Sequence, residues 1–177
     1  MHFFTNAVFT FASLVSFASL GIAQEPASSI IDGFNILTQK SQALIAPSQQ
    51  LSAFSFSATA QISKGLDDID DTTIPYTSVL QENTYQGNDA ININNAFHNL
   101  VQTQVSLMNI LTEKSGQINR VPFVGAPIAA GLRTHQGVFD SLASITAQSI
   151  SGDIKAQIES DAINLMNAIG QATDAYS

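Results

Sequence analysis

The chain has no cysteine and no tryptophan, and only 11% of its 177 residues are charged. A secreted domain without cysteine has to be stable through its packed core, because it has no disulfide bonds. Six basic against 14 acidic side chains give a net charge of −8, which disfavours binding to nucleic acid and to anionic membrane surfaces. These absences favour a regular, well-packed architecture.

Catalytic and metal-binding motifs are also missing. After residue 23 the chain has two histidines, His98 and His135, and neither an H-E-x-x-H nor a G-x-S-x-G motif. The run DDIDD at residues 67–71 lacks the glycine and the terminal glutamate of a calcium loop. We interpret it as a solvated helix end, partly offset by Lys64. The sequence therefore predicts a protein that is not an enzyme and that uses no metal or cofactor.

The first 23 residues have the character of a secretory signal. An apolar stretch ends in the small residues Gly21-Ile22-Ala23, where a signal peptidase would cut, and it is too short and too rich in Ser and Thr for a membrane anchor. We expect a signal peptide at residues 1–23 and a single domain at residues 24–177. The product would then be secreted and extracellular, without a transmembrane anchor.

Helical periodicity dominates the rest of the chain. Apolar residues recur at three- and four-residue steps in five segments, and strand patterns are nearly absent. We expect the first helix to end at Pro47, the second to run from Ser52 to Asp71 with Phe54 on its apolar stripe, and the third to begin near Asp89. The longest connection would span residues 72–89. Helices of this length with short links predict an all-α fold, a five-helix antiparallel bundle.

The apolar stripes predict a core of aliphatic and phenyl side chains. Such a core suits the hydrocarbon tail of a lipid between helices, and the alternative is a fully packed core without a ligand. The residues expected to line the tail are Phe34, Leu37, Leu44, Ile62, Leu66, Phe97, Leu100, Leu107, Leu111, Ile128, Leu132, Phe139, Leu142, Ile158, Leu165 and Ile169.

Three polar residues interrupt these stripes: Ser41, Gln104 and His135. One interpretation is that they are core or boundary groups satisfied by neighbouring backbone. The other is that they converge on the polar head of a ligand, since sparse hydrogen-bonding groups orient ligands in apolar pockets. The sequence leaves both interpretations open.

The fourth segment opens with RVPFVGAPIAAGLRTHQGVF at residues 120–139. Pro127 is placed for the first helical turn, where a missing amide donor costs least. Gly131 and Gly137 each weaken the helix by ~1 kcal/mol relative to alanine. Our hypothesis is that this helix is the movable wall of the bundle.

Four stretches of the chain resemble a known family. They read SIIDGFNILTQKSQAL, SATAQISKGLDDI, INNAFHNLVQTQVSLMNILTEKSGQI and VPFVGAPIAAGLRTHQGVFDSLASIT, and the similarity extends over about residues 28–175. In their order along the chain and their pattern of residues, these stretches resemble the fungal hydrophobic surface binding protein A and cell-wall galactomannoprotein family. The resemblance implies a five-helix bundle and, in some members, a cavity for long-chain fatty acids. This chain departs from the galactomannoprotein pattern in having one domain and no Ser/Thr/Pro-rich stalk.

The function we predict is a secreted, non-enzymatic protein that encloses a long-chain fatty acid or similar lipid in its helical bundle. The alternative is a coating or adaptor protein that adsorbs to hydrophobic surfaces and assists secreted hydrolases. The resemblance adds the cell wall as an expected location.

Overall fold

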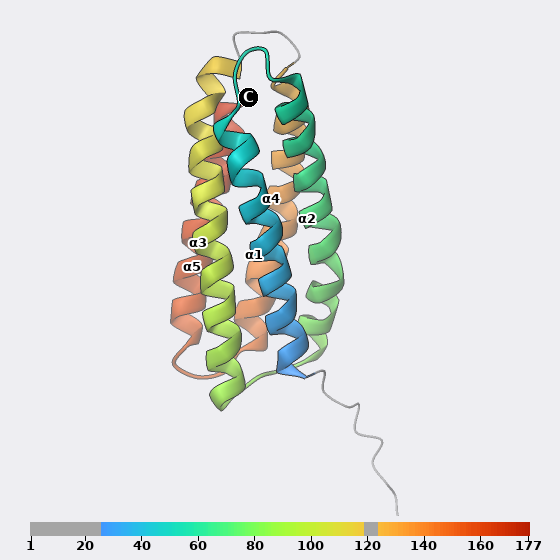
Figure 1. The fold of residues 1–177 in the computed structure, drawn as a ribbon. Helices are drawn as coiled ribbons and strands as arrows, with labels where there is room; N and C mark the ends of the chain where they lie inside the picture. The colour runs from blue at the N-terminus through green and yellow to red at the C-terminus, as the bar shows by residue number, and fades with distance from the viewer. Residues whose placement is uncertain (1–25, 119–123) are drawn as a thin grey trace, which may run out of the picture.

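The computed structural model describes residues 26–118 and 124–177, and these form five α-helices (Figure 1). This confirms the predicted all-α five-helix bundle. The predicted signal peptide at residues 1–23 lies outside the described residues. The helices are α1 (Ala27–Gln49), α2 (Phe56–Glu82), α3 (Gly87–Ile118), α4 (Ala126–Ser149) and α5 (Lys155–Ala175).

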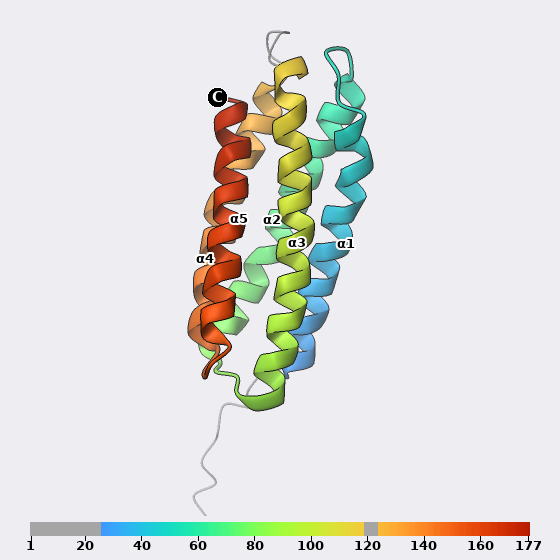
Figure 2. The same cartoon turned by 90° about the vertical axis from the view of Figure 1, so that its left-hand side faces the viewer.

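The helices form a closed ring. Within the described ranges each helix packs against two others, in the order α1, α2, α4, α5, α3 and back to α1. Consecutive helices run in opposite directions, so α1, α3 and α5 point one way and α2 and α4 the other (Figures 1 and 2). Most packed neighbours are next but one in the chain and therefore parallel, because α2 does not pack against α3, nor α3 against α4. A ring of this kind encloses one apolar interior.

α2 is longer than the sequence predicted. The expected connection at residues 72–89 is wrong, because α2 continues through Pro75 to Glu82. Pro75 removes one backbone donor, but it lies on the exposed face, where water can satisfy the freed carbonyl. Leu80 is fully buried beyond it, and Thr73 packs inward with its hydroxyl on the Ile69 carbonyl oxygen at 2.8 Å. Burial on the inner face therefore outweighs the cost of the proline.

Close approach of α1 and α2 depends on two glycines. A Cβ at Gly33 would lie 2.5 Å from the ring of Tyr76, and one at Gly65 would collide with the side chain of Leu44. Gly131 of α4 faces Leu66 of α2 in the same manner but with more room, 3.2 Å. These positions allow α2 to sit tightly between its two neighbours.

The helix ends mostly follow the predicted punctuation. Pro127 lies in the first turn of α4 as expected, α3 begins at Gly87, where φ is +58°, and the α4–α5 link turns at Gly152, where φ is +101°. Pro47, expected to end the first helix, lies inside its last turn. The α2–α3 link is joined to the end of α4, because the amide of Tyr85 donates to the carbonyl of Ser149 at 2.7 Å.

Phe54 does not join the stripe of α2. It precedes the helix and is 83% exposed, so its predicted core position is wrong. Among the described residues, no helix combines the length and the apolar character needed to cross a membrane.

Candidate functional site

The interior of the ring is built from the residues that the stripes predicted. All sixteen side chains expected to line a lipid tail are buried, and fifteen of them have no exposed surface. Leu44 is the exception, at 7% exposed. Phe34 and Phe97 pack with their ring centroids 5.5 Å apart, across the contact of α1 with α3. Whether these side chains touch a lipid stays a prediction.

A chain of polar side chains crosses this interior. Ser41 of α1 donates to the carbonyl of Leu37 at 2.7 Å, and the Gln104 amide of α3 donates to Ser41 Oγ at 2.9 Å. The Gln104 carbonyl oxygen lies 3.2 Å from His135 Nε2 of α4, and His135 Nδ1 lies 2.5 Å from Asp70 Oδ1 of α2. The three predicted polar residues thus meet inside the bundle. They bond to one another and to a fourth residue, Asp70.

The positions of the hydrogens along this series of polar side chains can be deduced by starting from the Ser41 hydroxyl. The one hydroxyl hydrogen of Ser41 is used on Leu37, so Ser41 Oγ must accept from the Gln104 amide group. The Gln104 oxygen then faces His135, and His135 Nε2 must carry a hydrogen to donate to it. One further proton lies between His135 Nδ1 and Asp70 Oδ1. The pair is therefore an imidazolium with a carboxylate or a neutral imidazole with a carboxylic acid, and both have zero net charge.

Asp70 corrects our interpretation of the run DDIDD. Asp67, Asp68 and Asp71 are exposed, but Asp70 is only 3% exposed, so the solvated interpretation is wrong for it. The run also lies within α2 and not at its end, and Asp68 pairs with Lys40 of α1 at 2.5 Å. The signal was available, because Asp70 follows Leu66 by four residues on the same stripe. The sequence analysis missed the buried position of Asp70 because the residue lies in a run of acidic side chains.

Together the four hydrogen-bonded polar side chains form a polar layer, and each lies near the middle of the helix that supplies it. α1 rises ~21 Å from Ala27 to Ser41 and ~12 Å from Ser41 to Gln49. Apolar core therefore extends on both sides of the polar layer, and the longer part lies toward the start of α1. A ligand with a polar head and a long tail matches this division.

A second histidine–aspartate pair lies on the other side of the ring. His98 Nδ1 of α3 is 2.8 Å from Asp161 Oδ2 of α5, and the two side chains are 38% and 9% exposed. Asp161 also lines a hollow of about 290 Å³ between these helices, together with polar side chains such as Gln102 and Asn164. This pair is outside the apolar interior.

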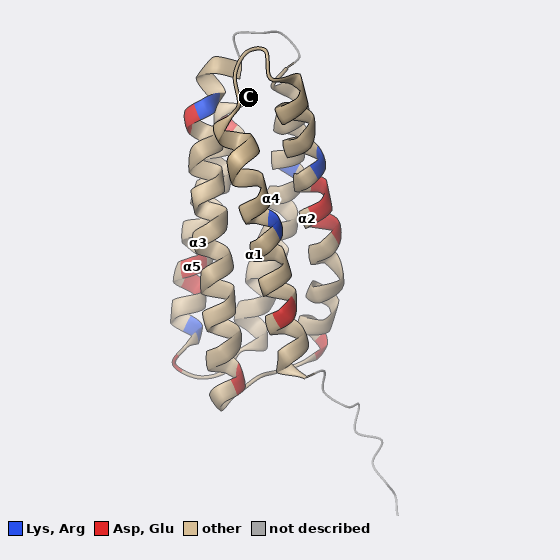
Figure 3. Cartoon of the chain, in the orientation of Figure 1, with Lys and Arg blue, Asp and Glu red and all other residues tan. Residues whose placement is uncertain are grey.

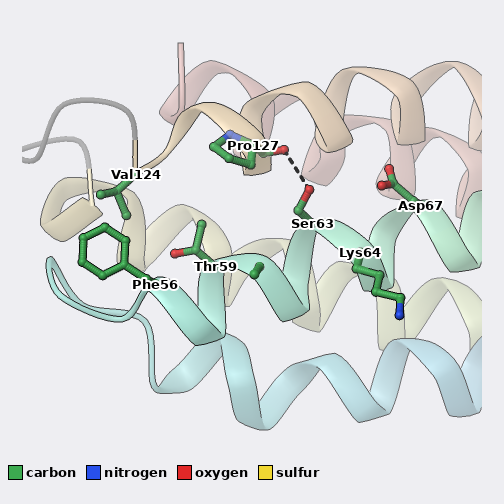
Figure 4. Close-up of a pocket in the computed structure, with 8 residues that line it drawn as sticks. Phe56, Thr59, Ser63, Lys64, Asp67, Val124 and Pro127 are labelled. Carbon is green, nitrogen blue, oxygen red and sulfur yellow. Dashed lines mark hydrogen bonds between the residues drawn. The ribbon is translucent and has the colours of Figure 1, made fainter.

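An apolar groove lies between the first turns of α2 and α4. It has a volume of about 450 Å³, and Figure 4 shows Phe56 beneath Val124 at one end and Lys64 and Asp67 at the other. Ser63 joins the two helices there by donating to the carbonyl of Pro127 at 3.4 Å. Phe56 is 64% exposed, so the groove opens to solvent at an aromatic rim.

Figure 3 shows the charged residues scattered sparsely along the helices. Within the described ranges no lysine or arginine is buried, and no group of three acidic or histidine side chains is placed to hold a metal ion. Burial raises the pKa of the Tyr176 phenol above its ordinary value, which keeps that group neutral. The interior therefore offers neutral or paired polar groups to a ligand, and its ionised candidates are confined to the Asp70–His135 pair.

The fold and this interior define a class: an all-α domain whose ring of helices encloses an apolar core crossed by one polar layer. The sequence matches no family model and no curated protein. Among solved structures the chain is similar to AfMP4p in complex with palmitic acid, with a TM-score of 0.77 at 16% identity over 86% of this chain and 100% of that one.

Two further structures have the same fold. Ligand-binding domain 2 of Penicillium marneffei MP1, complexed with multiple arachidonic acids, has a TM-score of 0.69 at 12% identity, over 85% of this chain and 93% of that one. Domain 1 of the same protein, complexed with arachidonic acids, has a TM-score of 0.67 at 13% identity, over 85% and 95%. These neighbours are members of the galactomannoprotein family. The resemblance noted in the sequence is confirmed as a shared fold.

Proposed function

We propose that this protein binds a long-chain fatty acid or a similar lipid between its helices. The observation that carries the proposal is the layer of hydrogen-bonded polar side chains at mid-length of a mainly apolar ring. The fold neighbours support it, because their structures contain palmitic and arachidonic acids. The alternative, a coating of hydrophobic surfaces, has less support, since the neighbouring structures are complexes with fatty acids.

The parts of the ligand divide between the two kinds of interior residue. The sixteen apolar side chains contact the tail, and the layer of Ser41, Gln104 and His135 orients the head. Each methylene that leaves water stabilises the complex by ~0.8 kcal/mol before the costs of binding are subtracted. A long-chain lipid can therefore bind tightly even if no lysine or arginine pairs with its head group.

Helix α4 is the wall that moves to admit the ligand. The tail-lining side chains are buried, so a lipid can reach them only if helices separate. α4 contains two glycines, and a Cβ at Gly137 would meet nothing within 4 Å, so Gly137 weakens the helix without permitting a close contact. Hydrogen exchange should show α4 less protected than α3 and α5 in the lipid-free protein and equally protected with lipid. Equal protection in both states would refute a moving α4.

A displacement titration tests the proposal. Purified protein is stripped of lipid, loaded with a fluorescent fatty acid and titrated with palmitic and arachidonic acids, while denaturing mass spectrometry identifies any lipid that co-purifies. We expect micromolar or tighter displacement and a co-purified lipid. Neither result appearing would defeat the proposal.

A matched pair of variants places the ligand in the interior. Leu100→Phe adds volume at a fully buried position, whereas Ile163→Phe adds a ring at a position that is 62% exposed. Because added volume in a filled interior displaces its contents, the first variant should bind about tenfold more weakly and the second should bind normally. Equal affinities would place the lipid outside the ring.

The protein acts as a binder outside the cell. Residues 1–23 support secretion through their signal-like pattern, and the family of the fold neighbours supports association with the cell wall. The lipid-bound neighbours support a non-enzymatic role. Appearance of the processed chain, beginning near Gln24, in the culture medium or wall fraction would test the location.

A further inference from the structure

One oxygen atom of the polar layer has no hydrogen-bond partner among the described residues. Asp70 uses Oδ1 on His135, but its second oxygen, Oδ2, is buried and unpaired. The whole residue is 3% exposed. A buried carboxyl oxygen without a partner is costly, and the binding of a suitable group there would remove that cost.

The hydrogen positions decide what this oxygen can do. Whether the shared proton sits on His135 Nδ1 or on Asp70 Oδ1, Oδ2 keeps only lone pairs and is an acceptor. A proton on Oδ2 instead would require His135 to carry both of its hydrogens beside an uncharged acid. That arrangement leaves a net positive charge in the interior with no counter-ion, which is the most costly of the three.

The other unpaired buried atoms are less informative about a ligand. Ser48 and Tyr176 end in hydroxyls, which can donate or accept, and the Asn94 amide can turn over to exchange its oxygen and nitrogen. None of these three belongs to the layer that crosses the interior. Of the four unpaired buried atoms in the described part of the chain, Asp70 Oδ2 is the one that belongs to that layer and that can act only as an acceptor.

We propose that the head of the bound lipid donates a hydrogen bond to Asp70 Oδ2, so the ligand class is a long-chain lipid with a hydroxyl, amide or protonated carboxyl head. Ser41, Gln104 and His135 hydrogen-bond to one another and position Asp70. An ionised carboxylate would bring lone pairs against lone pairs in a region from which water is excluded. This inference rests on the proposed function and specifies its ligand.

Four probes with the same 16-carbon chain separate charge from hydrogen-bond donation. Hexadecanol and hexadecanamide are neutral and donate, methyl hexadecanoate is neutral and cannot donate, and hexadecanoate at neutral pH is charged. Each is titrated against lipid-free protein by displacement of a neutral fluorescent dye. The alcohol and the amide should bind about tenfold or more tightly than the methyl ester, because a hydrogen bond to a buried carboxyl group is gained only by a donor. Hexadecanoate should be no tighter than the ester.

Two variants connect this preference to Asp70. The double variant Asp70→Leu/His135→Leu replaces the whole pair with apolar groups, which proteins often tolerate, and it should bind alcohol and ester equally. Asp70→Asn keeps an acceptor, because its amide group donates to Nδ1 of a neutral His135 and leaves the amide oxygen in the place of Oδ2. It should therefore keep the preference for the alcohol over the ester and discriminate less against hexadecanoate. Circular dichroism establishes that each variant is folded.

The outcomes separate this inference from the proposed function. Equal binding of alcohol and ester by the natural protein, or tightest binding of hexadecanoate, would overturn the inference and leave lipid binding intact. No binding of any probe would overturn both. In a crystal of the hexadecanol complex the alcohol oxygen should lie within hydrogen-bond distance of Asp70 Oδ2, and a water molecule there with the alcohol elsewhere would count against us.

Discussion

Two histidine–aspartate pairs with different surroundings occur in this bundle. His135 and Asp70 join α4 to α2 inside the ring, with side chains 0% and 4% exposed. His98 and Asp161 join α3 to α5 near the surface, with side chains 38% and 9% exposed. The same two chemical groups therefore face a dry interior in one place and partial solvent in the other.

The pairs also differ in what the second imidazole nitrogen meets. His135 Nε2 faces the oxygen of Gln104, which is itself held by Ser41, so both nitrogens have fixed roles. His98 Nε2 lies 3.4 Å from the amide nitrogen of Gln102, on the exposed side. The comparison teaches that a histidine–aspartate pair does not by itself fix a histidine. Burial, together with a second partner that is itself held in place, distinguishes His135 from His98.

Removing the inner histidine should have the largest effect on stability. His135→Leu leaves Asp70 buried without its partner, and loss of one member of a buried charged pair costs ~3–5 kcal/mol. The free energy of unfolding from urea titration measures this. Asp70→Leu/His135→Leu should recover most of the loss, because no unpaired group remains. A loss of less than ~1 kcal/mol in the single variant would show that Asp70 is not held by His135.

Removing the link between the pair and α1 should have a smaller effect. Gln104→Leu is close in size but leaves His135 Nε2 without its acceptor and Ser41 Oγ without its donor, so we expect a loss of ~1–3 kcal/mol in the free energy of unfolding. Gln102→Leu is the matched control at the outer pair, because Gln102 is exposed. Equal losses in the two variants would remove the distinction between the pairs.

Periodicity predicted most of the fold and of the apolar interior. The sixteen tail-lining positions are buried because a helix in a ring has one inner face, and spacing alone identifies that face. The polar residues Ser41, Gln104 and His135 were found by the same rule. Their mutual hydrogen bonds could not be predicted, since these depend on the order of helices around the ring, which a linear pattern does not contain.

The failures of the sequence analysis have local causes. The run DDIDD predicts a solvated Asp70 because runs of charge usually face water, although the spacing of Asp70 from Leu66 places it inside. The expected connection at residues 72–89 contains Pro75, whose ring removes a backbone donor, although the inner face of α2 continues beyond it. In both cases the position on the stripe outweighed the residue type.

Removing the outer histidine should have little effect on stability. His98→Ala breaks a pair that is partly open to water, and such pairs contribute ~0.2–1 kcal/mol. Urea titration of this variant beside His135→Leu makes the comparison directly. A loss above ~3 kcal/mol would show that Asp161, the less exposed partner, depends on His98 as Asp70 depends on His135.

The smallest expected difference is in the response of the two pairs to salt. The coupling energy of each pair is measured by a double-mutant cycle, first near 0.1 M and then near 1 M sodium chloride. Raising the salt shortens the screening length from about 10 Å to about 3 Å, which should remove a few tenths of a kcal/mol from His98–Asp161. His135–Asp70 lies where ions do not penetrate, so its coupling energy should stay constant. A salt-dependent coupling at the inner pair would mean that solvent reaches the centre of the ring, and the polar layer would then be open to water and not closed by the helices.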